Sequence, residues 1–166
     1  GEYRRLQNFI GPTIRIEDAR FVPPAPHHIP DLMERFSVFF TTQNDLPPLV
    51  KAAIMHYQFE TIHPFTDGNG RIGRALISVY LKRWKLLPIS LLFLSEFFQK
   101  YKGEYQERLL SVNKTGEFKI WLEFFLSAVA EQSDAAIQRA NRMLELKEKW
   151  ETMLKKAGAP RTVFKV

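Results

Sequence analysis

The chain has 166 residues, of which 45% are hydrophobic and 25% are charged, a balance that is ordinary for a single globular domain. Its formal charge of +6 favours anionic partners such as nucleotides, nucleic acid or acidic protein surfaces. Cysteine is absent from the sequence, which excludes disulfides, thiolate metal sites and cysteine nucleophiles. No apolar run reaches the roughly 18–20 residues that span a bilayer, so we expect no membrane partner and a cytoplasmic location.

The first 29 residues have an irregular pattern. Within them Thr13–Ile16 alternates between polar and apolar residues, as one arm of a short hairpin would. From Pro30 onward the helical period dominates. Proline favours the first turn of a helix, so Pro30 and the pair Pro47–Pro48 predict two helix starts.

The second half of the chain also has a helical pattern. A third helix is expected to begin in the glycine loop at 68–70, and shorter helices are expected at about 90–100 and 102–113. Gly116 is a typical C-terminal cap. A long last helix is expected from about Glu117 to Lys156, with a charge-dense second half that buries little. The sequence therefore predicts a mainly α fold with at most one small β element.

The most informative stretch runs from His63 to Arg74 and reads His-Pro-Phe-Thr-Asp-Gly-Asn-Gly-Arg-Ile-Gly-Arg. Its central part satisfies the dinucleotide-binding pattern G-x-G-x-x-G. That pattern requires a buried strand before it and a βαβ unit around it. Because a helical segment precedes the glycines and no parallel strands are evident, we exclude a Rossmann fold.

The residue types of this run suit a polyphosphate. Glycines at the start of a helix let backbone N–H groups converge on an anion, and the helix dipole adds to the attraction. Arg71 and Arg74 project from nearly the same helix face, where their planar guanidinium groups suit phosphate oxygens. Asp67 is a hard oxygen ligand for Mg²⁺. The unperturbed pKa of histidine suits a general base near neutral pH, so His63 is the candidate base. Each has an ordinary alternative: Asp67 as a helix N-cap, the arginines as solvated charges, His63 as a partly buried histidine. Together and in this order they indicate a phosphate-handling site.

The run matches every specified position of the Fic family motif, H-P-F-x-D/N-G-N-G-R-x-x-R, and the chain therefore resembles that family. Further similarity lies in Gly1–Arg4, Gln7–Gly11, Ala19–Pro24, Pro47–Pro48 and Phe124–Leu126. The resemblance implies one Fic domain over residues 1–166, a helical bundle with a small β-hairpin flap. It also implies that the domain transfers AMP from ATP, with Mg²⁺, to a Ser, Thr or Tyr hydroxyl of a target protein or of itself.

The resemblance implies a role for each position of the motif. His63 would deprotonate the target hydroxyl, Asp67 would hold Mg²⁺ between the α- and β-phosphates, and Phe65 would seat the loop as an apolar anchor. Arg74 would reach the γ-phosphate. The whole phosphate-binding set would be Gly68, Asn69, Gly70, Arg71 and Arg74.

Two regions outside the motif also resemble family features. The segment from about Thr13 to Val22 is similar to the flap that holds a target peptide by strand addition, with a plain surface loop as the alternative. Its target-binding residues would be Thr13, Ile14, Arg15 and Ile16. Tyr105, Leu109 and Asn113 are similar to positions that contact adenine. Gln106 stands where the family often has a second tyrosine, which leaves base selectivity open, and Tyr105 has the alternative role of a core aromatic.

The sequence also bears on how the domain would be regulated. Many Fic proteins carry an inhibitory helix, S/T-x-x-x-E-G/N. Thr13–Glu17 meets only half of that pattern, so we expect the regulator on an N-terminal segment or an antitoxin chain. A DNA partner is expected only with a C-terminal winged-helix domain.

Other Fic chemistry remains an alternative to AMP transfer: UMP or phosphocholine transfer, target phosphorylation and AMP removal. A non-catalytic binding module is a further alternative. Gly70 argues against phosphorylation, because that branch of the family has lysine there, and the intact His63 argues against a module without activity.

Overall fold

The computed structural model describes residues 2–43, 45–86 and 92–158, and within them the chain forms six α-helices and no β-strand. The helices are α1 (Ile29–Thr41), α2 (Pro48–Ile62), α3 (Asn69–Arg83), α4 (Leu94–Lys100), α5 (Lys102–Thr115) and α6 (Lys119–Lys156), and two 3₁₀ turns precede them, Ile16–Asp18 and Pro26–His28. The mainly α prediction is confirmed. The helix expected from about residue 90 begins at Leu94, and the start of that predicted range lies outside the described residues. None of the described helices has both the length and the apolar character needed to cross a membrane.

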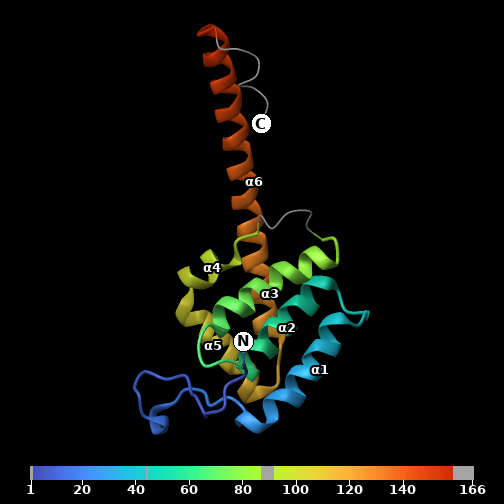
Figure 1. The fold of residues 1–166 in the computed structure, drawn as a ribbon, viewed down its shortest axis with the longest axis vertical. Coiled ribbons are helices and arrows are strands. Elements are labelled where there is room, and N and C mark those ends of the chain that lie inside the picture. Colours follow the sequence, from blue (N-terminus) through green and yellow to red (C-terminus); the bar gives the residue numbers. More distant parts are fainter. Residues whose placement is uncertain (1, 44, 87–91, 159–166) are drawn as a thin grey trace.

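Helix α2 is the central element of the bundle. It packs against α1, α3 and α6, and Figure 1 shows it lying between them. Its buried residues are Lys51, Ala52, Ala53, Met55, His56, Phe59 and Ile62, which together face more than one neighbour. A helix that is buried on several sides belongs to the core, so the residues at its C-terminal end are held rigidly.

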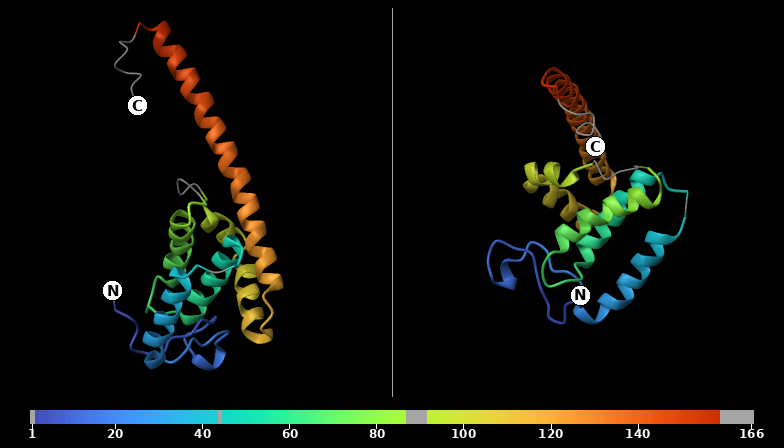
Figure 2. Two further views of the ribbon diagram at one scale, coloured as in Figure 1. Left: turned by 90° about the vertical axis from the view of Figure 1, so that its right-hand side faces the viewer. Right: turned by 45° about the horizontal axis from the view of Figure 1, so that its top comes forward.

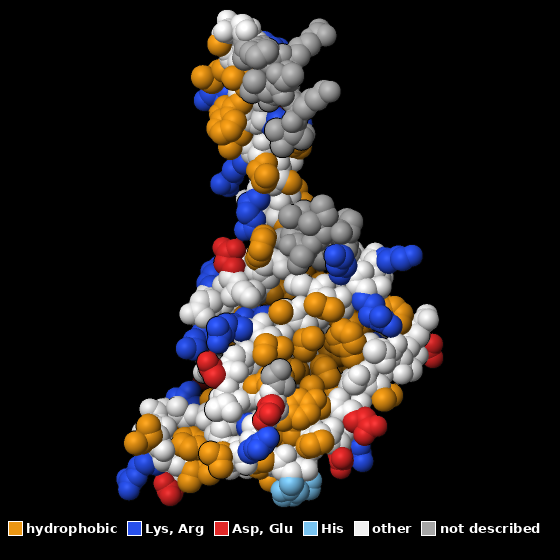
Figure 3. Space-filling model, viewed as in Figure 1, with side chains coloured by type: hydrophobic (Ala, Val, Ile, Leu, Met, Phe, Trp, Pro, Cys, Tyr) orange, Lys and Arg blue, Asp and Glu red, His pale blue; other side chains and the backbone are white. Residues whose placement is uncertain are grey.

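Helix α6 has two halves with different environments. Its first half contributes Trp121, Phe124 and Phe125 to the core, and the indole Nε1 of Trp121 donates a hydrogen bond of 3.0 Å to the carbonyl of Ala53 in α2. Its second half extends away from the bundle as a single helix (Figures 1 and 2). Figure 3 shows apolar and basic side chains side by side along this projection. The charge-dense part of the sequence is therefore the exposed part, as predicted.

The N-terminal segment lies against the end of the bundle that carries the glycine loop. The small hairpin predicted there is not confirmed: one antiparallel bridge, Ile10 to Phe21, closes the segment, and Thr13–Ile16 is not assigned as a strand. The hydroxyl of Thr13 donates to the Asp18 carboxylate at 2.7 Å. Such local side-chain bonds compete with strand pairing, and here they accompany a turn in place of an arm.

Candidate active site

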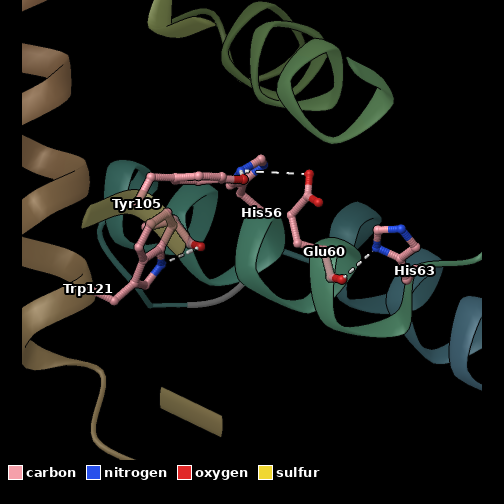
Figure 4. A network of polar contacts seen from close by, with 6 residues as sticks. His56, Glu60, His63, Tyr105 and Trp121 are labelled. Atoms are coloured by element: carbon pink, nitrogen blue, oxygen red, sulfur yellow. Dashed lines mark hydrogen bonds and ion pairs between the residues drawn. The ribbon is translucent and has the colours of Figure 1, made fainter. Parts of the chain in front are cut away.

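His63 ends helix α2 with a left-handed backbone, φ 49° and ψ 59°. This conformation costs a residue other than glycine about 1–3 kcal/mol, so it persists only where neighbouring contacts hold it. The imidazole Nδ1 lies 3.2 Å from the backbone carbonyl oxygen of Glu60 (Figure 4). Because a carbonyl oxygen only accepts, Nδ1 donates this bond and Nε2 of the neutral ring keeps its lone pair.

The surroundings of His63 favour that neutral form. Burial lowers the pKa of the imidazole, and the charge of Arg4 lowers it further, while the hydrogen bond to the Glu60 carbonyl raises it. Burial is the largest of these effects. Since the ordinary pKa of histidine is already 6.5, the ring is uncharged at neutral pH and its Nε2 is able to accept a proton.

Asn69 closes the loop between α2 and α3. Its Oδ1 accepts the backbone N–H of Phe65 at 2.9 Å, and its Nδ2 donates to the Phe65 carbonyl at 2.7 Å. Only 2% of Asn69 is exposed. The Phe65 ring packs between the rings of Tyr3 and Phe59, with centroids 6.0 and 6.3 Å away. The Phe65 ring is thus packed against neighbouring aromatic rings, and both polar atoms of the Asn69 side chain are bonded to the Phe65 backbone.

Two glycines shape the N-terminus of α3. Gly68 has φ 83°, where a side chain would be strained. A Cβ on Gly70 would lie 3.1 Å from Nη1 of Arg74, so the guanidinium of Arg74 lies directly over the first helical turn. The unpaired N–H groups at this helix start and the nearby arginines form a site suited to an anion.

Asp67 and Arg71 form the outer edge of the loop. The Asp67 side chain is 92% exposed, with Oδ1 2.6 Å from the backbone N of Gly68 and Oδ2 3.3 Å from Nη2 of Arg71. The described residues contain no group of three or more His, Cys, Asp or Glu side chains that would hold a metal ion. Mg²⁺ at nucleotide sites typically takes one or two carboxylates together with phosphate oxygens. One exposed carboxylate beside an anion site therefore fits an ion that is bound together with a nucleotide.

Beneath the loop lies a buried polar cluster that the sequence analysis missed. Nε2 of His56 lies 2.8 Å from the Tyr105 hydroxyl and 3.9 Å from Oε1 of Glu60 (Figure 4). Burial lowers the pKa of His56 to about 4 and raises that of Glu60 to about 7, although the charge of Arg74 opposes the second shift. The available signal was a histidine and a glutamate at i,i+4 in a helix otherwise rich in alanine and apolar residues.

The three predicted adenine residues line a single pocket of about 130 Å³, formed where α5 meets the C-terminal end of α2 and the base of the N-terminal loop. Leu109 and Asn113 lie along α5, and Gln106 and Glu60 also line the pocket. Tyr105 is only 8% exposed, and its ring packs in the core, so it is both a pocket wall and a core aromatic.

The structure brings some predicted residues together and leaves others apart. His63, Phe65 and the positions from Asp67 to Arg74 form one continuous loop and helix start. Thr13–Ile16 forms part of an exposed loop in which the Ile14 side chain is 96% exposed.

Residues 1–81 match the model of the Fic/DOC family. The chain is 38% identical over 91 residues to the protein adenylyltransferase Fic of Drosophila grimshawi, an alignment that covers 54% of this chain and 17% of the relative. It is 31% identical over 137 residues to the protein adenylyltransferase Fic of Nematostella vectensis, covering 81% of this chain and 29% of the relative. The chain thus spans less than a third of the length of these relatives.

Solved structures of Fic proteins also superpose on this chain. A Fic family protein from Desulfovibrio desulfuricans G20 superposes with a TM-score of 0.69 at 27% identity, over 84% of this chain and 41% of that protein. Fic-1 from C. elegans superposes with a TM-score of 0.53 at 25% identity, over 75% of this chain and 35% of that protein. The helical fold is therefore shared with these Fic proteins.

Proposed function

Residues 1–81 of this chain belong to the Fic/DOC family, and on this premise we propose that the chain is a protein adenylyltransferase that moves AMP from ATP to a hydroxyl of a target protein or of itself. The observation that supports the proposal most directly is the state of His63, whose Nδ1 donates to the Glu60 carbonyl and whose Nε2 is left as a base, five residues before the glycine-rich start of α3 at Gly68. ATP as the donor and Mg²⁺ belong to the same proposal and rest on the resemblance of the motif. The cytoplasmic location stays a prediction.

In the proposed reaction His63 acts as general base. Its Nε2 takes the proton of the target hydroxyl while the hydroxyl oxygen forms a bond to the α-phosphorus. The bond from that phosphorus to the oxygen bridging to the β-phosphate breaks, and pyrophosphate leaves. The Nδ1–H bond to the Glu60 carbonyl holds the ring in one orientation and stabilises the imidazolium that forms.

The remaining loop residues would bind the triphosphate. The backbone N–H of Gly70 and the guanidinium groups of Arg71 and Arg74 would contact phosphate oxygens, and the N–H of Gly68 would do so in exchange for its present bond to Asp67 Oδ1. Asp67 would hold Mg²⁺, which neutralises phosphate charge when bound.

The resemblance also indicates where the adenine and the target peptide would bind. The pocket with Leu109 and Asn113 would take the adenine. The exposed loop at Thr13–Ile16 would contact the target peptide, and the target itself would be a protein with an accessible hydroxyl.

The test is a labelling experiment. The protein is incubated with Mg²⁺ and ATP labelled at either the α- or the γ-phosphate, with cell lysate as the source of targets. The variant His63→Ala removes the base, and His27→Ala is the matched control because His27 is an exposed histidine outside the loop.

AMP transfer predicts that protein is labelled from the α position only, that His63→Ala abolishes the label, and that His27→Ala retains it. Label from the γ position alone would show phosphorylation, and no label from either position would contradict a transferase. Both results reject the proposed function.

A further inference from the structure

Arg4 is a buried arginine bonded to the backbone of the His63 turn. Only 4% of it is exposed. Its Nε donates to the carbonyl of His63 at 2.9 Å, and its backbone N–H donates to the carbonyl of Pro64 at 2.9 Å. Its two terminal nitrogens donate to the carbonyls of Leu6, at 3.3 Å, and of Pro24. One residue thus ties both carbonyls of the turn to the N-terminal segment.

The bonding pattern of Arg4 differs from that of an ordinary buried arginine. Within the described ranges it has no carboxylate within ion-pair distance, and its guanidinium bonds only to backbone carbonyls. Burying a charge without a counterion is costly. The planar guanidinium has five N–H donors in a fixed arrangement, which lets it bond several carbonyls at once where lysine, a compact point charge, does not.

The turn that Arg4 holds is the strained one. His63 adopts a left-handed backbone although it carries a Cβ, and such a conformation requires external contacts. Arg4 binds the carbonyls of two consecutive peptide groups, His63–Pro64 and Pro64–Phe65, and these carbonyls define the direction in which the chain leaves α2. A change in that direction would rotate the imidazole and break the bond of its Nδ1 to the Glu60 carbonyl.

We propose that Arg4 is a positioning residue for His63, which fixes the left-handed turn from the N-terminal segment and thereby aims Nε2 at the reacting hydroxyl. This inference rests on the proposed function and deepens it, because it names a residue outside the motif on which the base depends.

The charge of Arg4 supports the same role. Arg4 faces His63 from the N-terminal segment, and the Glu60 carbonyl faces it from α2; the exposed Asp67 and Arg71 lie farther along the loop and pair with each other. The positive charge of Arg4 lowers the pKa of His63, which favours the neutral ring that a general base requires.

The test compares two variants of Arg4 with a neighbouring control. Arg4→Lys keeps the charge and loses the planar set of donors, whereas Arg4→Gln loses both. Arg5→Gln is the matched control, because Arg5 is adjacent in sequence but exposed and bonded only to Glu2, at 2.8 Å. Each rate is divided by the folded fraction measured by circular dichroism.

We expect Arg4→Lys to lower kcat about 10- to 100-fold, as a misplacement on the order of 1 Å does, while KM for ATP stays within about 2-fold. Arg5→Gln should leave both within about 2-fold. A wild-type kcat in Arg4→Lys, or a loss fully explained by the unfolded fraction, overturns the proposal.

A second measurement does not depend on activity. The titration of His63 is followed by NMR, with its signals assigned by their loss in His63→Ala. Arg4→Gln should raise the pKa of His63, and Arg5→Gln should not change it. An unchanged His63 pKa in Arg4→Gln contradicts the contact. If the wild type transfers no AMP yet the pKa responds to Arg4→Gln, the proposed function fails while the link between Arg4 and His63 stands.

Discussion

The two ends of the motif loop differ in how firmly the free protein holds them. At the His63 end, the carbonyl of His63 is bonded to Arg4, its ring is bonded to Glu60, and the following Phe65 is bonded twice to Asn69. At the other end, the side chains of Asp67 and Arg71 are 92% and 76% exposed; they pair with each other at 3.3 Å, and Asp67 also accepts the backbone N–H of Gly68. One end is therefore fixed by buried contacts, and the other meets solvent.

This difference separates two tasks. A general base needs one orientation and one protonation state before the substrate arrives, and buried hydrogen bonds provide both. Groups that neutralise a triphosphate can remain hydrated until the ligand supplies their partners, because an exposed ion pair contributes only about 0–1 kcal/mol. We therefore expect changes at the His63 end to affect catalysis and changes at the Asp67 end to affect binding.

The largest effect is expected from His63→Ala. Loss of a general base lowers kcat by about 10²–10⁴-fold, with little change in KM for ATP. Steady-state kinetics of AMP transfer measure both constants. In the wild type, the lowered pKa of His63 should place the midpoint of the acid-side decline in kcat/KM below the ordinary histidine pKa. A midpoint at or above that ordinary value would contradict the lowered pKa.

Asn69→Ala should have the next largest effect. It leaves the N–H and C=O of Phe65 without the amide partner they now have, at a cost of about 1–3 kcal/mol for each buried group. The loosened loop should lower kcat about 100-fold. Urea unfolding and kinetics measure the two losses. Asn141→Ala, at an exposed position of α6, is the control and should change stability by less than about 0.5 kcal/mol. Equal stability of the two variants would show that the loop does not depend on Asn69.

Arg71→Gln should affect binding alone. Because Arg71 is exposed and paired only with Asp67, we expect unchanged thermal stability and a KM for ATP raised about 10-fold, with an effect that shrinks at high salt. Arg108→Gln removes a comparable i,i+4 pair, with Glu104, outside the loop and should leave KM unchanged. A loss of kcat with normal KM in Arg71→Gln would break the proposed division of tasks.

The smallest effect concerns the buried cluster below the loop. The pKa of Glu60 is raised from 4.5 to about 7, so its contribution to stability is lost as the pH rises through about 7. The pKa of His56 is lowered from 6.5 to about 4, so its contribution is lost as the pH falls through about 4. Between about pH 4.5 and 6.5, a rise in pH therefore lowers the free energy of unfolding through Glu60 and raises it through His56, so the two effects oppose each other.

Glu60→Gln should remove the loss of stability with rising pH that Glu60 causes, and leave the opposite effect of His56. The variant then gains stability with rising pH, by at most about 1.4 kcal/mol per pH unit, while the wild type stays nearly level. Urea unfolding at about pH 5, 6 and 7 measures the difference. Parallel curves for the two proteins would show that Glu60 has an ordinary pKa in the folded state.

Much of this arrangement was predictable from local sequence. Pro30 and Pro47–Pro48 placed the starts of α1 and α2, and Gly116, in a left-handed conformation, ends α5 as expected. Helix starts and stops depend on a few neighbouring residues, so the sequence carries them directly. The motif run likewise becomes one loop and one helix start because its residues are consecutive.

What the sequence did not predict depends on contacts between distant or buried residues. Arg4 is separated from His63 by 59 positions, and no periodic pattern links them. The side-chain bonds of Asn69 to the backbone of Phe65 were not foreseen, and its assignment to the phosphates stays a prediction. The hairpin arm at Thr13–Ile16 had the alternation of a strand, but the bond from Thr13 to Asp18 accompanies a turn instead.

The central claim is that His63 is oriented and neutral before any substrate binds. The most direct measurement is the ¹⁵N NMR signature of the two ring nitrogens of His63 in the ligand-free protein at neutral pH. We predict a protonated Nδ1, bonded to the Glu60 carbonyl, and an unprotonated Nε2. A proton on Nε2 of the neutral ring, or a doubly protonated ring at that pH, would contradict the claim.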